Sequence, residues 1–359
     1  MTIDIPEDSR ILRQVLKAYQ IEKDCRIESF GTGLINHTWK IYTPHADYIL
    51  QEINTRVFTN PNAIADNIIK IKDYLRKYPD YYFVAPIPSV QGDQLVQVQK
   101  SFYRLFPFVP GSHSVDVVSS CAQASQAAYQ FGKFTRLLSG LDADSLNITL
   151  PHFHDLSLRY SQFVDAHING NKERIARVSW LSELLFSHAQ IVKDFDFIVG
   201  NPEFKKRVTH HDTKISNVLF NPKDEALCVI DLDTVMPGYF ISDLGDMIRT
   251  YVCPVSEEEQ DFSKIIIRED YYFTIIEGYN RGMEIELTEA EKNHFFYAGK
   301  FMIYMQALRF LTDYLLDDIY YGAAYDDHNL NRAQNQTILL QKLIEKEAIL
   351  TGKTKVLTG

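Results

Sequence analysis

The sequence predicts an α+β protein with two lobes: a small N-terminal lobe built on an antiparallel β-sheet and a large, mainly helical C-terminal lobe. Short segments rich in β-branched and aromatic residues are concentrated before residue 107. Apolar residues with helical spacing dominate the chain after it. A proline-rich stretch at 106–111, typical of a linker, separates the two patterns. We therefore expect two domains, 1–106 and 107–359.

The N-terminal lobe is expected to begin with a helix over 8–20, because its apolar residues share one face. Five later segments have the short, turn-bounded pattern of strands: 25–30, 38–43, 47–53, 94–99 and 102–106. The first three are close enough in the chain to form an antiparallel meander. After the meander, Asn60 as N-cap and Pro61 at the first helical position predict a second helix.

The C-terminal lobe is expected to be helical except for one embedded hairpin. Helical spacing of apolar residues extends over five segments: 115–139, 155–168, 172–198, 287–320 and 331–350. Between them, the region 206–234 contains two short apolar runs around the turn Asn221-Pro-Lys-Asp224. Apolar runs on either side of such a turn are typical of a β-hairpin.

Charge and cysteine usage exclude several classes of protein. Lysine and arginine number 37 against 47 aspartates and glutamates, a net charge of −10, which disfavours binding to nucleic acid or to an anionic membrane. The N-terminus is polar and acidic, and no apolar run is long enough for a membrane span. The four cysteines form no C-x-x-C pair and are expected to be buried, reduced thiols. We therefore expect a cytoplasmic protein.

One stretch carries the residue types that phosphoryl transfer needs. His210-His-Asp212-Thr-Lys214-Ile-Ser-Asn217 has the H-x-D-x-x-x-x-N spacing of a kinase catalytic loop, and Asp231 follows at the end of the hairpin. A carboxylate must orient the acceptor hydroxyl and take its proton, a role we predict for Asp212. Asn217 and Asp231 offer the oxygen ligands that Mg²⁺ prefers. Lys214 is expected to place its ammonium on the transferring phosphoryl oxygens.

Other polar residues near this stretch have less specific predictions. His210 is expected to brace the loop through a backbone hydrogen bond. Asp233 is either a second metal contact or a cap of the following turn. Asp243 and Asp246 are expected to cap and brace the next helix rather than to touch a substrate.

A nucleotide-binding loop is predicted at Gly31-Thr32-Gly33-Leu-Ile-Asn36, between two predicted strands. Backbone N–H groups of a glycine-rich loop in this position can fold over phosphate groups. A plain hairpin turn would use the same residues.

The next strand departs from the kinase pattern. Gln51 stands where a protein kinase has its phosphate-binding lysine, and the following helix lacks the partner glutamate. Either Gln51 binds the phosphates or another basic residue does so. Phe106 and Phe108 in the linker are expected to contact adenine, and the same residues would suit an ordinary linker that packs its own aromatics.

An acceptor site is predicted on the helix near residue 310. Arg309 and Asp313 are four positions apart and share a face, with Tyr314 next to them. An Arg–Asp pair beside an aromatic ring suits a sugar, since the charged groups bond hydroxyls and the ring covers an apolar face. An intrahelical salt bridge on the surface is the alternative.

The segments HHDTKISNVLF, VIDLDTVMPG and SDLGDMIR, following a small β lobe and a linker, resemble the aminoglycoside phosphotransferase and choline kinase family. Together with LPHFHDLSLR (150–159) and RFLTDYL (309–315), these motifs are most similar to the N-acetylhexosamine 1-kinase branch. The resemblance implies a protein-kinase-like fold, Asp212 as catalytic base, and Asn217 and Asp231 as magnesium ligands.

The leading hypothesis is an ATP- and Mg²⁺-dependent small-molecule kinase whose acceptor is the anomeric hydroxyl of an N-acetylhexosamine, an amino sugar. Choline, homoserine or an aminoglycoside are alternative acceptors. The absent lysine–glutamate pair motivates a different class, a nucleotide-binding pseudokinase that acts as a sensor or scaffold. A glycosidase using Asp212 and Asp231 leaves Asn217 and the glycine-rich loop unexplained.

Overall fold

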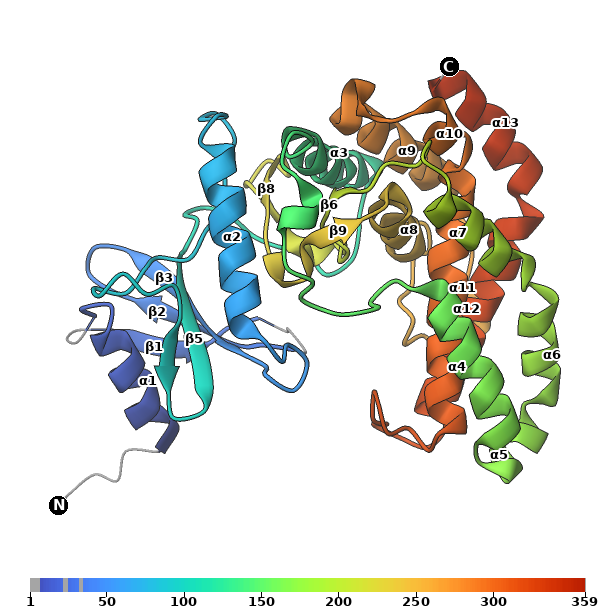
Figure 1. Cartoon of the computed structure of the whole chain (residues 1–359), viewed down its shortest axis with the longest axis horizontal. Coiled ribbons are helices and arrows are strands. Elements are labelled where there is room, and N and C mark those ends of the chain that lie inside the picture. Colours follow the sequence, from blue (N-terminus) through green and yellow to red (C-terminus); the bar gives the residue numbers. More distant parts are fainter. Residues whose placement is uncertain (1–6, 22–24, 32–34, 359) are drawn as a thin grey trace. The chain divides into compact units, whose positions relative to one another are not determined.

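The computed structural model describes residues 7–21, 25–31 and 35–358, so Thr32 and Gly33 of the predicted nucleotide loop lie outside the described residues. The chain forms two compact units (Figure 1). The N-terminal unit contains the chain up to Ser112 and two later segments, Asp144–Pro151 and Ile230–Met236. The C-terminal unit contains the remaining segments: His113–Ala143, His152–Val229 and the chain from Pro237 onward.

An antiparallel sheet with strand order β1-β2-β3-β5-β4 forms the centre of the N-terminal unit. Its strands are β1 (Arg26–Ser29), β2 (His37–Tyr42), β3 (Asp47–Ile53), β4 (Val96–Val98) and β5 (Ser101–Pro107). The unit's helices are α1 (Glu7–Lys17) and α2 (Pro61–Leu75). As predicted, Asn60 caps α2, accepting a hydrogen bond from the backbone N–H of Ala63 at 3.3 Å. The predicted meander is confirmed.

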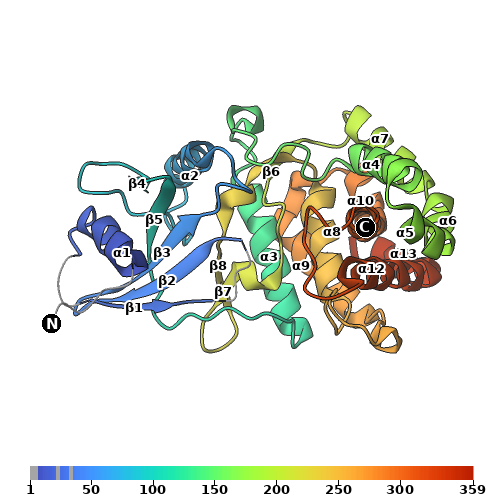
Figure 2. The same cartoon turned by 90° about the horizontal axis from the view of Figure 1, so that it is seen from below.

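The two faces of this sheet have different partners. Helix α1 lies beside the sheet (Figure 2). Its apolar residues pack on one face, which includes Leu50 of β3 and Leu105 of β5. Neighbouring residues of a strand point to opposite faces, so Gln51 and Arg104 lie on the other face, opposite each other in the β3–β5 register. Gln51, which the sequence analysis assigns to nucleotide binding, therefore lies on the face of the sheet that α1 does not cover.

The C-terminal unit is mainly helical, which confirms the predicted α+β fold class. Its helices are α3 (Cys121–Leu137), α4 (Leu156–Asn169), α5 (Lys172–Arg177), α6 (Ser179–Ser187), α7 (Gln190–Gly200), α8 (Phe240–Tyr251), α9 (Glu269–Met283), α10 (Glu289–Asn293), α11 (Phe295–Leu315), α12 (His328–Glu345) and α13 (Glu347–Thr358). Its short 3₁₀ turns are η2 (Ile215–Asn217), η4 (Phe262–Lys264) and η5 (Glu284–Glu286), whereas η3 (Leu232–Thr234) and most of η1 (Ala143–Ser145) belong to the N-terminal unit.

Three predicted helices are divided in the structure. The segment 172–198 forms α5, α6 and α7, because the backbone leaves helical geometry at Val178 (φ −113°, ψ 19°) and again at His188 (φ −94°, ψ 12°). A similar break at His294 separates α10 from α11. Another at Lys346 separates α12 from α13. Apolar spacing continues across such breaks because both helices bury the same side, so periodicity alone did not reveal them.

The predicted hairpin is confirmed as β7 (Val218–Phe220) and β8 (Ala226–Val229). The side-chain oxygen of Asn221 accepts hydrogen bonds from the backbone N–H groups of Lys223 (2.8 Å) and Glu225 (3.0 Å), which closes the turn. On the flanks of the hairpin, β6 (Arg207–Thr209) and β9 (Met236–Gly238) form a second two-stranded sheet.

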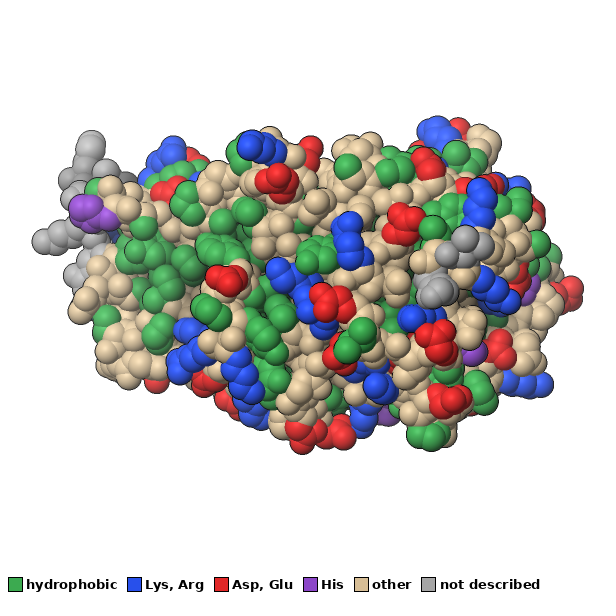
Figure 3. Space-filling view, turned by 90° about the horizontal axis from the view of Figure 1, so that it is seen from above, with side chains coloured by type: hydrophobic (Ala, Val, Ile, Leu, Met, Phe, Trp, Pro, Cys, Tyr) green, Lys and Arg blue, Asp and Glu red, His purple; other side chains and the backbone are tan. Residues whose placement is uncertain are grey.

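The surface charges and the burial of the cysteines agree only in part with the sequence analysis. On the face drawn in Figure 3, basic and acidic side chains lie interspersed rather than in separate fields. Within the described part of the chain, no helix has the length and apolar composition needed to cross a membrane. All four cysteines are free thiols, but only Cys228 and Cys253 are buried; Cys25 and Cys121 are half-buried.

Candidate active site

The predicted catalytic loop begins where β6 ends and is held by a buried histidine. His210 is fully buried, and its ring lies edge-on to Phe131 at a centroid distance of 5.1 Å. Its Nδ1 accepts a hydrogen bond from the backbone N–H of Asp212 at 3.4 Å. The predicted bracing role of His210 is therefore confirmed.

Two buried carboxylates of α8 hold the same loop. Asp243 accepts hydrogen bonds from the backbone N–H groups of His210 (3.1 Å) and His211 (2.7 Å), and Asp246 accepts one from Thr213 (2.9 Å). The prediction that both aspartates cap the next helix is wrong, because α8 already begins at Phe240 and they lie inside it. Burial raises the pKa of Asp243 to about 7, although its two N–H donors oppose this.

Asp212, Lys214 and Asn217 come together at the loop. Nδ2 of the buried Asn217 donates to the backbone carbonyl of Asp212 (2.9 Å) and to its Oδ2 (3.0 Å). Nζ of Lys214 lies 3.2 Å from the same Oδ2. Both bonds of Asn217 use its amide nitrogen, so its amide oxygen is the atom suited to a cation. Oδ1 of Asp212 takes part in neither contact and is suited to an acceptor hydroxyl. These residues fit the chemistry of a Mg²⁺–phosphate site.

Asp231, the other predicted metal ligand, belongs to the N-terminal unit, whereas Asp212 and Asn217 belong to the C-terminal unit. It is exposed and follows β8 in a left-handed backbone conformation, with φ 60° and ψ 67°. Such a conformation costs a non-glycine residue about 1–3 kcal/mol and persists where surrounding structure enforces it. Residues of this kind are concentrated at active sites, which supports a functional interpretation of Asp231.

Asp233 forms an ion pair, which was neither of its two predicted roles. Oδ1 of Asp233 lies 2.5 Å from Nη1 of Arg104, and both side chains are almost completely buried. Its Oδ2 accepts a hydrogen bond from Nδ2 of Asn36 at 2.9 Å. Gln51 is also engaged: its Oε1 accepts from Nε (3.2 Å) and Nη2 (2.9 Å) of Arg104, and its Nε2 donates to Thr38 at 3.3 Å. Sequence analysis missed Arg104, whose one signal was its charge in an otherwise apolar stretch of strand.

The other predicted nucleotide residues are placed as follows. Gly31 has φ 82°, which suits a tight loop. Asn36 is used internally, since its Oδ1 also accepts the backbone N–H of Asn54 at 3.0 Å. Phe106 and Phe108 are half-buried. The Phe108 ring lies 3.5 Å from the ammonium of Lys40, a basic residue that the sequence analysis did not single out.

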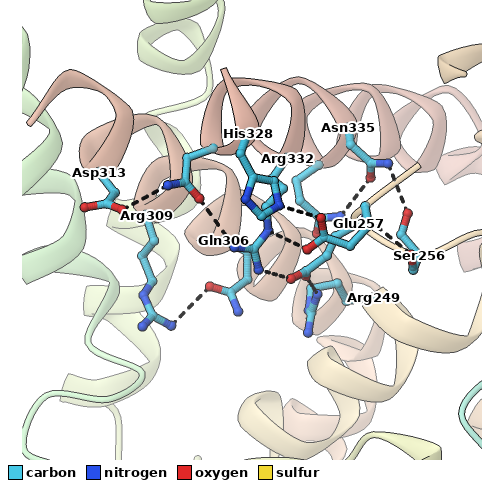
Figure 4. A network of polar contacts seen from close by, with 12 residues as sticks. Arg249, Ser256, Glu257, Gln306, Arg309, Asp313, His328, Arg332 and Asn335 are labelled. Carbon is cyan, nitrogen blue, oxygen red and sulfur yellow. Dashed lines mark hydrogen bonds and ion pairs between the residues drawn. The ribbon is translucent and has the colours of Figure 1, made fainter. Parts of the chain in front are cut away.

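The predicted acceptor residues do not act as a pair. Nη1 of Arg309 donates to Gln306 at 3.1 Å, and Asp313 binds other groups (Figure 4). The buried carboxylate of Asp313 accepts the backbone N–H groups of Tyr320 (2.7 Å) and Tyr321 (2.9 Å), closing the loop after α11. The expected Arg309–Asp313 contact is therefore absent from the described structure. The buried ring of Tyr314 lies under the guanidinium of Arg174 at 4.5 Å.

Arg309 instead lies among aromatic rings close to the catalytic loop. Its guanidinium is 5.8 Å from the ring centroid of Phe153 and 5.4 Å from that of Tyr321. Next to Phe153, Nδ1 of His154 is 3.3 Å from Nδ1 of His211, the residue before Asp212. Burial lowers the pKa of His154 well below its ordinary value, and neighbouring basic groups lower it further: His211, Arg309, Arg249 and Arg159.

A buried charge network links the catalytic loop to α12 (Figure 4). Arg249 pairs with Asp246, which holds the loop, at 3.0 Å and with Glu257 at 2.6 Å. Glu257 also accepts a hydrogen bond from Arg332. Burial tends to raise the pKa of Glu257, but the two arginines outweigh this and the pKa is lowered. The carboxylates around Arg249 and Arg332 are therefore matched by positive charge.

Comparison with known proteins agrees with this geometry. A family model described as the phosphotransferase enzyme family matches residues 26–263, well over half of the chain. The match identifies the protein as a phosphotransferase. The chain belongs to the phosphotransferase enzyme family.

Solved structures with the same fold have little sequence in common with this chain. An aminoglycoside phosphotransferase from Alicyclobacillus acidocaldarius is 11% identical, with TM-score 0.67 over 95% of each chain. A spectinomycin phosphotransferase in complex with ADP and spectinomycin is 13% identical, with TM-score 0.59 over 98% of this chain and 99% of that one. A choline kinase from Streptococcus pneumoniae is 12% identical, with TM-score 0.54 over 94% and 98%. At these identities the likeness shows the kinase-like fold.

Proposed function

We propose that this phosphotransferase is an ATP- and Mg²⁺-dependent kinase that phosphorylates the anomeric hydroxyl of an N-acetylhexosamine. The observation that carries the proposal is the loop geometry, in which Asn217 and Lys214 hold one carboxylate oxygen of Asp212 and leave the other for a hydroxyl proton. The spectinomycin enzyme of the same fold binds ADP, which supports the nucleotide.

In this proposal each residue has a separate task. Oδ1 of Asp212 orients the acceptor hydroxyl and takes its proton as the oxygen–phosphorus bond to the acceptor forms and the bond between the γ-phosphorus and the bridging oxygen breaks, releasing ADP. The ammonium of Lys214 lies beside the reacting oxygens and offsets their developing negative charge. Asn217 and Asp231 supply oxygen ligands for Mg²⁺, which neutralises the phosphate groups. The glycine-rich loop from Gly31 to Asn36 is the part of the N-terminal unit proposed to bind the phosphates, through its backbone N–H groups.

The rings of Phe106 and Phe108 cover the adenine in this proposal. Both lie at or just beyond the end of β5 and are half-buried, which leaves part of each ring for a planar ligand. Lys40 against the Phe108 ring fixes one side of that ring. Backbone groups of the same stretch are suited to hydrogen bonds with the adenine edge.

The charges near the catalytic loop favour a neutral acceptor over a cationic one. Within residues 35–358, neither Arg309 nor Arg159 has a carboxylate at ion-pair distance; Arg309 bonds Gln306, and Arg159 bonds Gln162 and a backbone carbonyl. By contrast, other arginines of the same unit pair with carboxylates: Arg174, Arg177, Arg207, Arg249 and Arg332. A choline or aminoglycoside cation would meet uncompensated positive charge here.

A sugar suits the same surroundings. Guanidinium N–H groups donate to hydroxyl and acetamido oxygens, and aromatic rings cover the apolar face of a pyranose. Arg309 has rings on either side of it, Phe153 and Tyr321, and Asp313 fixes the backbone of Tyr320 and Tyr321. We therefore propose Arg309 as a direct acceptor contact and Asp313 as an indirect one. Tyr314, buried under Arg174, takes no part.

A coupled ADP-release assay with a panel of acceptors tests the proposal. The panel contains N-acetylglucosamine, N-acetylgalactosamine, glucose, choline, homoserine and an aminoglycoside, with Asp212→Asn as the inactive control. We expect release with the N-acetylhexosamines and formation of the sugar 1-phosphate, detected by phosphorus NMR. Release only with choline or the aminoglycoside contradicts the acceptor proposal. Nucleotide binding without release for any acceptor contradicts the kinase itself.

A further inference from the structure

The chain lacks the strand lysine of protein kinases, yet the same face of the sheet contains a buried arginine. Arg104 of β5 is 1% exposed. Its Nη1 lies 2.5 Å from Asp233, and its Nε and Nη2 donate to Gln51 on the neighbouring strand. Gln51 is not available to bind phosphate in this arrangement, because its amide oxygen accepts from Arg104 and its amide nitrogen donates to Thr38.

Residues of three strands thus form a row that leads to one carboxylate of the segment after β8. Thr38 of β2, Gln51 of β3 and Arg104 of β5 form a hydrogen-bonded row across the sheet, and the row ends at Asp233. Asn36 donates a hydrogen bond to the second carboxylate oxygen of Asp233 at 2.9 Å. All of these residues lie in the N-terminal unit.

The segment that contains Asp233 is also held from a second side. Asn67 of α2 donates to the backbone carbonyl of Val235 at 3.1 Å and to that of Asn147 at 2.9 Å. The 3₁₀ turn Leu232–Thr234 between the two anchors is buried, whereas Asp231 at its start is exposed and left-handed. Asp231, the residue in the strained left-handed conformation, is therefore exposed at the start of a segment that Arg104 and Asn67 hold in place.

We propose that Arg104 and Asp233, with Gln51 and Asn36, form a positioning cluster that holds Asp231 ready to bind Mg²⁺. The inference rests on the metal role proposed above for Asp231. Mutating residues that orient a metal ligand from behind typically weakens metal affinity by about 10- to 100-fold. In protein kinases a lysine–glutamate pair must be in place for phosphoryl transfer; here a buried arginine–aspartate pair anchors the metal-binding segment instead.

The pair's burial dictates which variants are informative. Removing one partner leaves an uncompensated buried charge, whereas replacing both by apolar residues of similar size is often neutral for stability. Arg104→Met and the double variant Arg104→Met/Asp233→Leu therefore separate stability from positioning. Arg207→Met is the matched control, because it breaks another buried arginine–carboxylate pair, Arg207–Glu291 at 2.6 Å, in the C-terminal unit.

Hydrogen exchange of the metal-free protein gives a readout that is independent of catalysis. We expect Arg104→Met to accelerate amide exchange in peptides covering 230–236 by about tenfold or more, as for a locally opened segment. Arg207→Met should leave residues 230–235 at the wild-type rate even where it lowers the melting temperature; Met236 is left out of this comparison, because its strand β9 pairs with β6, which contains Arg207. Wild-type exchange at 230–236 in Arg104→Met would overturn the proposed anchoring.

Mg²⁺-dependent ADP binding, measured by calorimetry, tests the link to the metal. Arg104→Met should weaken the Mg²⁺-dependent part of the affinity by about 10- to 100-fold, while metal-free ADP binding stays close to wild type. The double variant should recover the melting temperature but not the Mg²⁺ dependence. Recovery of both together would mean a structural role only. Absence of any Mg²⁺ dependence in the wild type would contradict the proposed function, and the exchange result would still decide the anchoring.

Discussion

At the scale of single residues, the two carboxylate oxygens of Asp212 have different surroundings. Oδ2 accepts a hydrogen bond from Asn217 and lies 3.2 Å from the Lys214 ammonium. Oδ1 is involved in neither contact. This asymmetry fixes the orientation of the carboxylate, so the oxygen left over is the one proposed to take the acceptor proton.

We expect Asp212→Asn to lower kcat by about 10²- to 10⁴-fold, the usual contribution of a general base. Nucleotide affinity should stay near wild type, because the base interacts with the acceptor hydroxyl and the transition state rather than with ADP. Coupled ADP release measures the first effect and calorimetry with ADP and Mg²⁺ the second. Unchanged turnover would show that Asp212 is not the base.

Arg309 and Asp313 lie on the same helix but have opposite predicted phenotypes. Arg309→Ala should lower kcat/KM for the true acceptor by about ten- to a hundredfold, equivalent to about 1–3 kcal/mol for a lost buried hydrogen-bonded group. Its melting temperature should stay close to wild type. Acceptor-independent ATP hydrolysis should be unaffected.

Asp313→Ala is the comparison variant for Arg309→Ala. It leaves the backbone N–H groups of Tyr320 and Tyr321 without their acceptor, so we expect a loss of about 1–3 kcal/mol in stability by urea unfolding. Equal effects of the two variants on stability, with unchanged kcat/KM in Arg309→Ala, would rule out Arg309 as an acceptor contact.

At the scale of elements, helix packing determines how precisely the catalytic loop is held. Asp243 and Asp246 are one turn apart on α8, so both carboxylates point to the same side and reach N–H groups of the same loop, at His210, His211 and Thr213. Elsewhere in the same unit, α3 and α9 approach closely through glycines. A side chain at Gly282 would place its Cβ 2.5 Å from the carbonyl oxygen of Tyr129.

We expect Gly282→Ala to destabilise the protein by about 1–3 kcal/mol, because backbone must move to admit the methyl group. Gly352→Ala in α13 is the control, since nothing lies within 4 Å of its added Cβ. That substitution should stabilise by about 0.5–1 kcal/mol through helix propensity. Urea unfolding followed by circular dichroism measures both, and equal effects would refute close packing of α3 on α9.

At the scale of the whole molecule, stability depends on pH through groups whose pKa values differ between the folded and unfolded states. Asp243 is such a group, because burial raises its pKa from the ordinary 3.8 to about 7. The folded protein therefore binds this proton more tightly than the unfolded chain does.

The sign of the Asp243 contribution follows from that raised pKa. Its stabilisation is fully present below the unfolded pKa of 3.8 and is lost as pH rises through about 7. We expect the difference in unfolding free energy, wild type minus Asp243→Asn, to fall between about pH 5 and about pH 8 and then to level off. Urea unfolding of both proteins over this range measures it. A difference that rises with pH would mean that the folded protein lowers the pKa of Asp243.

Features that depend on neighbouring residues could be predicted from the sequence. Asn60 before Pro61 determined the start of α2, and the turn at Asn221 determined the β7–β8 hairpin. The spacing of Asp212, Lys214 and Asn217 predicted a kinase-type loop, and the structure brings these three side chains together. Local hydrogen bonds and short loops cause each of these features, so a short stretch of sequence is sufficient to specify them.

Features that depend on long-range register were decided only by the tertiary structure. Asn36 and Asp233 are 197 positions apart, and nothing local indicates that they meet. The partnership of Arg104 with Gln51 follows from the β3–β5 register, which a shift of one residue would reverse to the opposite face. Asp313 was expected to face Arg309, but loop N–H groups after α11 compete for its carboxylate. A buried charged group bonds to the partners that the tertiary structure places next to it, and helical spacing alone does not identify those partners.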